Sequence, residues 1–189
     1  MTIHLTGFGK FGNIEDNPTM HHARFIEENL DKLGPPVAID HIQIVGVSME
    51  DCEDSLQQIR QKIEASDSSH HLILNMGVAA GRKNICLERI ARNIADFRIP
   101  DMRGNKPRNQ PICKDLSVDD CCMTTLELEN AIDSLNDDKI CISDDAGEYI
   151  CNYMFYRALE TAKSLCTDGR KCHAMFLHMP AFKSLSEEK

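Results

Sequence analysis

The stretch that decides the fold runs from Lys139 to Leu165 and reads KICISDDAGEYICNYMFYRALETAKSL. It opens with a short β-rich run, passes through an acidic turn that contains a glycine, and continues as a long segment whose apolar residues recur at helical spacing. A second β-rich run, AMFLHMP at 174–180, follows. A strand, a helix and another strand in this order are typical of an α/β protein.

The same alternation extends toward the N-terminus. Residues 78–120 are the exception, because their apolar residues fit neither period, and we expect this segment to be irregular or extended. Strands are predicted at 2–6, 37–47 and 71–77, and helices at 17–33, 49–66 and 124–136. Alternating strands and helices predict one α/β domain whose largely parallel sheet is covered on both faces.

The first predicted helix carries its own start and stop signals. Asn17 can cap it, Pro18 suits its first turn, and the GPP run at 34–36 ends it. Its expected apolar stripe consists of Phe25, Ile26, Leu30 and Leu33.

Length and charge narrow the class of protein. A chain of 189 residues suits one domain with a sizeable core, so residues 1–189 are expected to form a single unit. A formal net charge of −9 disfavours a nucleic-acid partner. No apolar run approaches the roughly 18 residues of a membrane span, and the N-terminus lacks the pattern of a secretory signal. We therefore expect a soluble protein of the cytoplasm.

Nine cysteines are an unusual number, and an odd one, so they cannot all pair within the chain. In a reducing compartment the simplest expectation is free thiols. No C-x-x-C pair occurs, and structural zinc sites usually show such spacing, so no metal is expected.

The glycine-rich start GFGKFG, residues 7–12, fits G-x-G-x-x-G after a strand and raises the possibility of a dinucleotide site. The next helix, however, begins near Pro18 rather than inside the motif, and no acidic residue ends the second strand. Phe8 and Phe11 also occupy the turn that a pyrophosphate would approach. The two rings are either core residues or aromatic faces that grip a small flat ligand at the sheet edge.

Cys151 is the candidate nucleophile, because it lies in the first turn of a predicted helix. Backbone N–H groups there stabilise a thiolate and can donate to an oxyanion. The acidic Asp144 and Asp145 oppose this unless their side chains cap the helix. The alternative is that Cys151 is simply a small buried hydrophobic residue.

A nucleophilic thiol needs a base, and His178 ends a strand at the edge where the Cys151 helix begins. His173 begins the same strand and is expected at the opposite edge. The carboxylate that would orient the base cannot be chosen by spacing alone. The residues by themselves therefore indicate a Cys–His hydrolase of unknown substrate.

Four blocks together resemble one known family, pyroglutamyl peptidase I, also called the pyrrolidone-carboxylate peptidases. They are TGFGKFG…NPT, GVAAGRKNICLERIARNIADFRIPD, SDDAGEYICNYMFY and FLHMP, which occur in the family's order. The resemblance implies an α/β/α sandwich and a cysteine exopeptidase that removes N-terminal pyroglutamyl residues through a thioester. In this resemblance Cys151 is the nucleophile, His178 the general base and Glu88 the group that orients the histidine.

The resemblance also implies a substrate site. Phe8 and Phe11 would sandwich the pyrrolidone ring, and Arg98 matches the family's active-site arginine. Val78 stands where some members have a glutamine that hydrogen-bonds the substrate. Pyroglutamyl peptides are the implied partners, with no metal or organic cofactor, no membrane and no nucleic acid, and with a homo-oligomer as an open possibility.

Some positions depart from the family pattern. Lys10 replaces a common proline and is expected to loosen the loop that positions Phe11, and Ala80 replaces a usual glycine. Many relatives continue into another amphipathic helix where this sequence reads AFKSLSEEK, which would leave apolar surface for self-association or a partner to cover. These departures leave an alternative open, a catalytically weak or inactive relative that binds pyroglutamyl peptides or serves as an interaction module.

Overall fold

A computed structural model describes residues 1–12, 14, 16–32, 34 and 38–182. The expected stripe residue Leu33, the break at 35–36, the strand start at 37 and the tail at 183–189 lie outside these residues. The strands are β1 (Thr2–Phe8), β2 (Ala38–Val45), β3 (His70–Val78), β4 (Ile85–Glu88), β5 (Ile90–Arg92), β6 (Cys121–Met123), β7 (Ile140–Ser143) and β8 (Lys171–Met179). The helices are α1 (Pro18–Glu28), the short 3-10 helix η1 (Leu30–Lys32), α2 (Met49–Glu64), α3 (Leu128–Leu135) and α4 (Ile150–Leu165).

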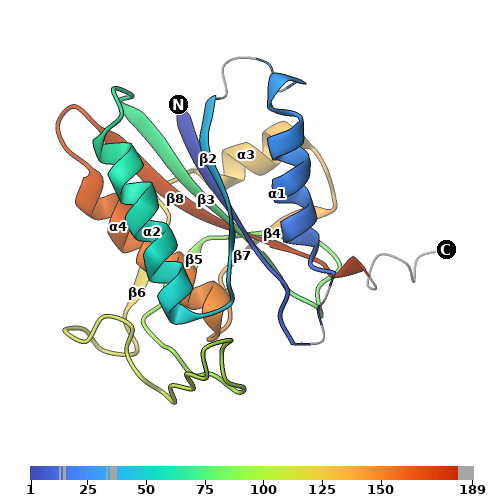
Figure 1. The fold of residues 1–189 in the computed structure, drawn as a ribbon, viewed down its shortest axis with the longest axis vertical. Helices are drawn as coiled ribbons and strands as arrows, with labels where there is room; N and C mark the ends of the chain where they lie inside the picture. Colours follow the sequence, from blue (N-terminus) through green and yellow to red (C-terminus); the bar gives the residue numbers. More distant parts are fainter. Residues whose placement is uncertain (13, 15, 33, 35–37, 183–189) are drawn as a thin grey trace.

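Six strands form the central sheet in the order β2-β1-β3-β8-β4-β7. All neighbours in it are parallel except β4 and β8, which are antiparallel. Figure 1 shows α1 on one side of the sheet and α2 and α4 on the other. These features confirm the predicted single-domain α/β fold with a largely parallel, mixed sheet.

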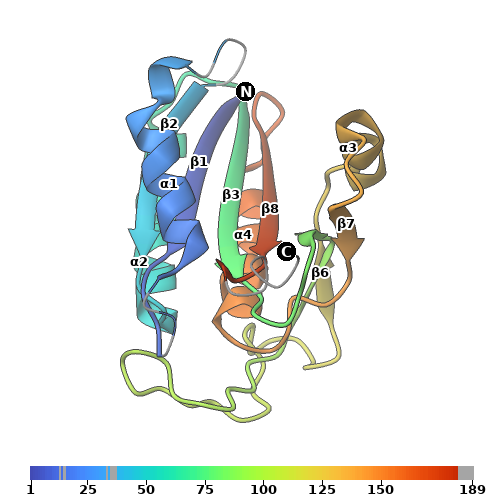
Figure 2. The same cartoon turned by 90° about the vertical axis from the view of Figure 1, so that its right-hand side faces the viewer.

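The segment at 78–120, expected to be irregular or extended, contributes the two short strands β4 and β5. β4 has only four residues and is inserted between β8 and β7, so its pattern was too short to be recognised as a sheet strand. The rest of the segment forms a long loop that lies beyond the C-terminal end of β3, at the bottom of Figure 2. Open α/β sheets bind their ligands at this edge.

The N-terminal end of α1 is as predicted, but its buried face is not. Asn17 Oδ1 accepts a hydrogen bond from the Thr19 backbone N–H at 3.0 Å. Phe25, expected in the core, is 66% exposed, because the buried residues of the helix are Pro18, Thr19, Met20 and Ala23. The reason is a close approach: a Cβ on Gly7 of β1 would come within 2.5 Å of the Thr19 carbonyl oxygen. The small residues of α1 therefore face the sheet, and Phe25 lies on the other side.

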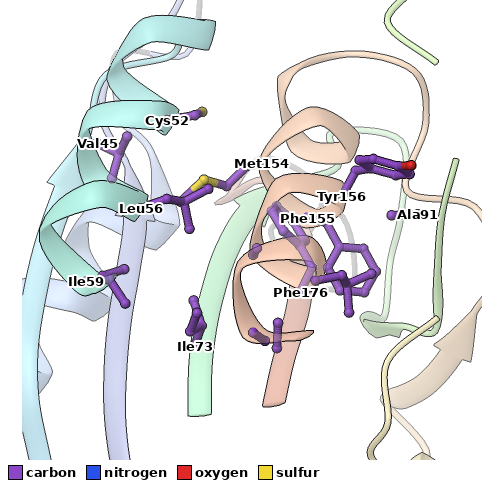
Figure 3. Close-up of a cluster of buried hydrophobic side chains, with 14 of the residues drawn as sticks. Val45, Cys52, Leu56, Ile59, Ile73, Ala91, Met154, Phe155, Tyr156 and Phe176 are labelled. Carbon is purple, nitrogen blue, oxygen red and sulfur yellow. The ribbon is translucent and has the colours of Figure 1, made fainter. Parts of the chain in front are cut away.

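The main core lies between the sheet and the pair α2 and α4. Figure 3 shows Leu56 of α2 beside Met154 of α4, with Phe155 and Phe176 deeper against the sheet. Leu56, Ile59 and Ile63 of α2 and Ile150, Met154, Leu159 and Ala162 of α4 recur at helical spacing in the sequence, and all of them are buried. Because α4 is packed along its length in this core, its first turn is held at a defined place on the sheet edge.

The first turn of α4 is also anchored through the buried side chain of Asn152. Its Oδ1 accepts from the Arg92 backbone N–H, and its Nδ2 donates to the carbonyls of Arg92 and Ile94, each at 2.9 Å. A side-chain amide that satisfies three backbone groups connects α4 to β5 and to the segment that follows it. The Asn152 side chain therefore joins the start of α4 to the start of the long loop.

We expect Asn152→Ala to lower the free energy of unfolding by roughly 2–4 kcal/mol, since it leaves backbone donors and acceptors without partners. Urea unfolding followed by circular dichroism measures this value. Asn130→Ala is the matched control, because Asn130 is exposed on α3 and its Nδ2 contacts only the Glu127 carboxylate there. Equal midpoints for the two variants would show that the Asn152 bonds do not contribute to stability.

Candidate active site

Cys151 is the second residue of α4, and the loop from β7 leads directly into it. Tyr149 precedes the helix, Gly147 adopts a φ of +79°, and the first turn carries no acidic residue. Tyr149 is the N-cap residue of α4, and within the described part of the chain no side-chain hydrogen bond caps the helix at this position. The backbone N–H groups of the first turn are thus oriented toward the thiol end of the helix, as expected from the sequence.

His178 lies near the C-terminal end of β8 and is 4% exposed. It pairs in register with Gly77 of parallel β3 and with Cys86 of antiparallel β4. Glu88, the last residue of β4, is wholly buried, and its Oε1 accepts a hydrogen bond from His178 Nδ1 at 2.7 Å. A proton held on Nδ1 directs the other ring nitrogen, Nε2, toward the remaining partner of the histidine.

That partner is Cys151, whose sulfur lies over Gly77, the neighbour of His178 on β3, and whose negative charge raises the pKa of the histidine. Burial by itself lowers the pKa of the histidine, and the negative charge of Cys151 raises it. Glu88 adds to the effect, and together they raise the pKa of His178 to about 9. At neutral pH the His178 ring is therefore an imidazolium, held between Cys151 and the Glu88 carboxyl group.

The two acidic residues before the helix are engaged elsewhere. Asp144 forms a two-pronged ion pair with Arg89, whose Nε and Nη2 lie 2.7 and 2.6 Å from its oxygens. Asp145 Oδ1 accepts from the Gly147 backbone N–H at 3.0 Å. Both residues are exposed, and neither forms a side-chain cap at the start of α4, where Tyr149 is the N-cap residue. Their expected conflict with a thiolate at Cys151 is reduced by these contacts and by water.

Gly77 allows the sulfur to lie directly over β3. A Cβ at this position would come within 2.9 Å of Cys151 Sγ and 2.7 Å of the Phe176 ring. Real Cβ atoms do not approach other atoms this closely, so only glycine leaves room for the thiol at this place. The sequence shows Gly77 as the end of a strand pattern, but nothing in it indicates contact with Cys151.

A cleft of about 860 Å³ opens beside the start of α4. Its lining includes Phe11, Arg98, Gly147, Glu148 and Tyr149. The rings of Phe11 and Tyr149 lie 5.5 Å apart and tilted by 40°. The cleft therefore combines aromatic surface with an exposed guanidinium beside the helix that carries Cys151.

The expected substrate-site residues are distributed between this cleft and the core. Phe11 and Arg98 line the cleft, whereas Phe8 is 5% exposed and packs in the main core. Val78 ends β3 and pairs in register with Met179. Tyr149 was not singled out from the sequence, and its only signal was an aromatic residue directly before the predicted Cys151 helix. Burial raises the pKa of Tyr149 to about 12, so its ring stays neutral.

The part of the chain that the structure describes has neither a cluster of metal ligands nor a membrane-spanning helix. No group of three or more His, Cys, Asp or Glu side chains there is placed to hold a metal ion. No helix among these residues has the length and apolar character needed to span a bilayer. All nine cysteines have free thiols.

The comparisons of this chain with known proteins agree on one family. A family model described as pyroglutamyl peptidase matches residues 1–188. The pyrrolidone-carboxylate peptidase of Treponema denticola is 28% identical over 183 residues, which cover 95% of this chain and 78% of the relative. That of Thermococcus litoralis is 32% identical over 178 residues, covering 93% and 74%.

Solved structures show the same likeness. A pyrrolidone carboxyl peptidase of Fervidobacterium islandicum matches with a TM-score of 0.77 at 27% identity, covering 95% of this chain and 81% of that one. A pyrrolidone carboxyl peptidase of Pyrococcus furiosus matches with a TM-score of 0.79 at 26% identity, covering 100% and 85%. With the fold, the Cys–His–Glu arrangement and the full-length family match in agreement, this chain belongs to the pyroglutamyl peptidase family of cysteine hydrolases.

Proposed function

We propose that Cys151, His178 and Glu88 hydrolyse the bond that follows an N-terminal pyroglutamyl residue in peptides. The observation that carries this proposal is that the Cys151 sulfur lies over Gly77, beside His178, and that His178 in turn hydrogen-bonds the buried Glu88 carboxylate. Membership of the pyroglutamyl peptidase family supports the choice of substrate. An inactive relative would not need this buried arrangement of charges, so the observations favour an enzyme over a binding module.

The cleft suits such a substrate. A pyroglutamyl end is a neutral, nearly flat lactam ring without the charged amine of ordinary peptides. The ring of Phe11 offers an apolar face for it, with Phe8 packed in the core behind and Val78 at the end of β3. In our proposal Arg98, which is exposed at the cleft, contacts the polar edge of the substrate.

The reaction proceeds in two steps. The Cys151 thiolate attacks the pyroglutamyl carbonyl carbon, and the backbone N–H groups at the start of α4 stabilise the oxyanion. The His178 imidazolium then gives its Nε2 proton to the leaving amine, which releases the shortened peptide and leaves a thioester. His178, now neutral, takes a proton from water, and the resulting attack frees pyroglutamic acid and restores the thiolate.

Glu88 acts through the histidine. Its carboxylate holds the Nδ1 proton, fixes the ring orientation and stabilises the imidazolium that the first step requires. Because Glu88 is wholly buried, water does not weaken this interaction.

We also propose that the protein works in the reducing cytoplasm. The activity depends on a thiolate, and all nine cysteines are free. Such a set of thiols persists where glutathione and thioredoxin keep cysteines reduced.

Replacing the nucleophile tests the central assignment. We expect Cys151→Ala and His178→Ala each to reduce kcat/KM for a pyroglutamyl–aminocoumarin substrate by a factor of about 10³ or more. Cys121→Ser, at an exposed cysteine on β6, should retain wild-type activity. Iodoacetamide followed by mass spectrometry should label Cys151 first among the nine thiols of the wild-type chain. Substantial turnover by Cys151→Ala would exclude it as the nucleophile.

Adding a single methyl group beneath the sulfur tests the packing of the site. Gly77→Ala should reduce kcat/KM by about tenfold or more, because the new Cβ must displace Cys151 Sγ or the Phe176 ring. Gly169→Ala is the control, since a Cβ there meets nothing within 4 Å. Steady-state kinetics with the same substrate compare the two variants, and equal activity would show that the sulfur does not need the space at Gly77.

The pH dependence tests the role of Glu88. Because His178 has a pKa of about 9, its proton is lost as the pH rises through that value, and kcat/KM should decline there. Glu88→Gln removes a negative charge that raises this pKa, so the alkaline limb should move to lower pH and kcat/KM should fall about a hundredfold or more. Glu64→Gln, at an exposed residue of α2, should leave the limb in place. An unmoved limb in Glu88→Gln would contradict this role.

A further inference from the structure

Arg82 connects two parts of the active site that are far apart in the sequence. It lies in the turn between β3 and β4, with its side chain about three-quarters buried at 28% exposure. Its Nη1 donates to Glu88 Oε1 at 2.7 Å, and its Nη2 donates to the Asp145 carbonyl oxygen at 2.5 Å. The first contact is with the carboxylate that orients His178, and the second is with the loop that leads into the Cys151 helix.

The carboxylate of Glu88 uses one oxygen for two partners. Oε1 accepts both from Arg82 and from His178, while Oε2 is buried and has no hydrogen-bond partner among the described residues. Removing the guanidinium would therefore leave a wholly buried carboxylate with the imidazole as its single partner. Buried charges that lose one partner are strongly destabilised.

The charges of the site sum to zero only when Arg82 is included. A thiolate at Cys151 and an imidazolium at His178 cancel, and Glu88 then needs a second positive charge. The groups that face Arg82 are Glu88 and Cys86 from β4, Cys141 from β7, and the Asp145 carbonyl. Among them Glu88 is the acid that the proposed mechanism requires in its ionised form.

We propose that Arg82 is a positioning residue for the peptidase reaction, which keeps Glu88 ionised and aligned on His178 while it anchors the loop before Cys151. This inference rests on the proposed function of Cys151, His178 and Glu88. Arg82 itself touches no reacting atom, and its effect passes through Glu88 and the backbone of Asp145. A guanidinium suits this task because its planar fork donates to two acceptors at once, which the single ammonium of lysine does less well.

Arg89 provides a matched comparison. It holds the same loop through the Asp144 carboxylate and also contacts Glu129 of α3. Its side chain is 36% exposed, and its partners among the described residues do not include Glu88. Loss of Arg89 therefore removes an anchor from the loop without removing the positive charge beside the buried carboxylate.

The test measures kcat/KM for the pyroglutamyl–aminocoumarin substrate between about pH 5 and pH 10 in wild type, Arg82→Met, Arg82→Lys and Arg89→Met. For Arg82→Met we expect a loss of about tenfold or more, and a profile displaced to higher pH by about one unit. The direction follows because removing a nearby positive charge makes every neighbouring group hold its proton more strongly. Arg82→Lys should recover the wild-type position of the profile with only part of the rate. Arg89→Met should leave the position unchanged, since water and salt screen its charge.

The rate of Cys151 alkylation by iodoacetamide, followed by mass spectrometry over the same pH range, gives a second readout that does not require turnover. It should show the same displacement in Arg82→Met and none in Arg89→Met. Circular dichroism checks that each variant folds. If Arg82→Met does not, Arg82→Gln replaces it, because glutamine keeps hydrogen-bond donors but has no charge.

Two results would overturn the inference: a profile for the neutral Arg82 variant at the wild-type position, or an equal displacement in Arg89→Met. The second would mean that loop anchoring alone is at work. Absence of pyroglutamyl hydrolysis by the wild type would instead contradict the proposed function, and the alkylation series would still decide whether Arg82 controls the state of Cys151.

Discussion

The contact on which the rest of the site depends is the hydrogen bond between Glu88 and His178. It exists because β4 runs antiparallel to β8, so that the C-terminal residue of one strand lies diagonally opposite the C-terminal part of the other. If β4 ran parallel to β8, the same residues would pair differently, and Glu88 would lie opposite another part of β8. β4 and β7 run opposite to the other four strands of the sheet, and this reversal brings the carboxylate to the histidine.

Because the contact between Glu88 and His178 is buried, the two charges interact strongly, and they also need other charges that compensate them. Glu88 is wholly buried and His178 is 4% exposed, so their charges interact through protein rather than water. Such charges remain ionised only when they are compensated. In the proposed mechanism the charges of Cys151, His178, Glu88 and Arg82 alternate in sign, and the elevated pKa of His178, about 9, is consistent with that alternation. Polar side chains farther out, such as Asn152, hold the backbone that carries these groups.

Much of the fold follows from local pattern. The helices α2 and α4 bury the stripes expected of them, and the strands at both ends of the sheet were recognisable from short β-rich runs. Phe25 shows where pattern fails, because helical spacing does not say which face a close-packed neighbour will select. The close approach of Gly7 to the Thr19 carbonyl decides that face, and it involves two segments that pair only in three dimensions.

By itself the sequence determined an α/β domain, the placement of Cys151 at a helix start and of His178 at a strand end, and a resemblance to one peptidase family. Such features depend on residues close together in the chain. Only the tertiary structure decided that Glu88 is the partner of His178, that Gly77 makes room for the sulfur, and that Arg82 joins Glu88 to the loop before Cys151. These contacts join residues from different strands and loops, and the order of strands in the sheet, which local periodicity does not encode, brings them together.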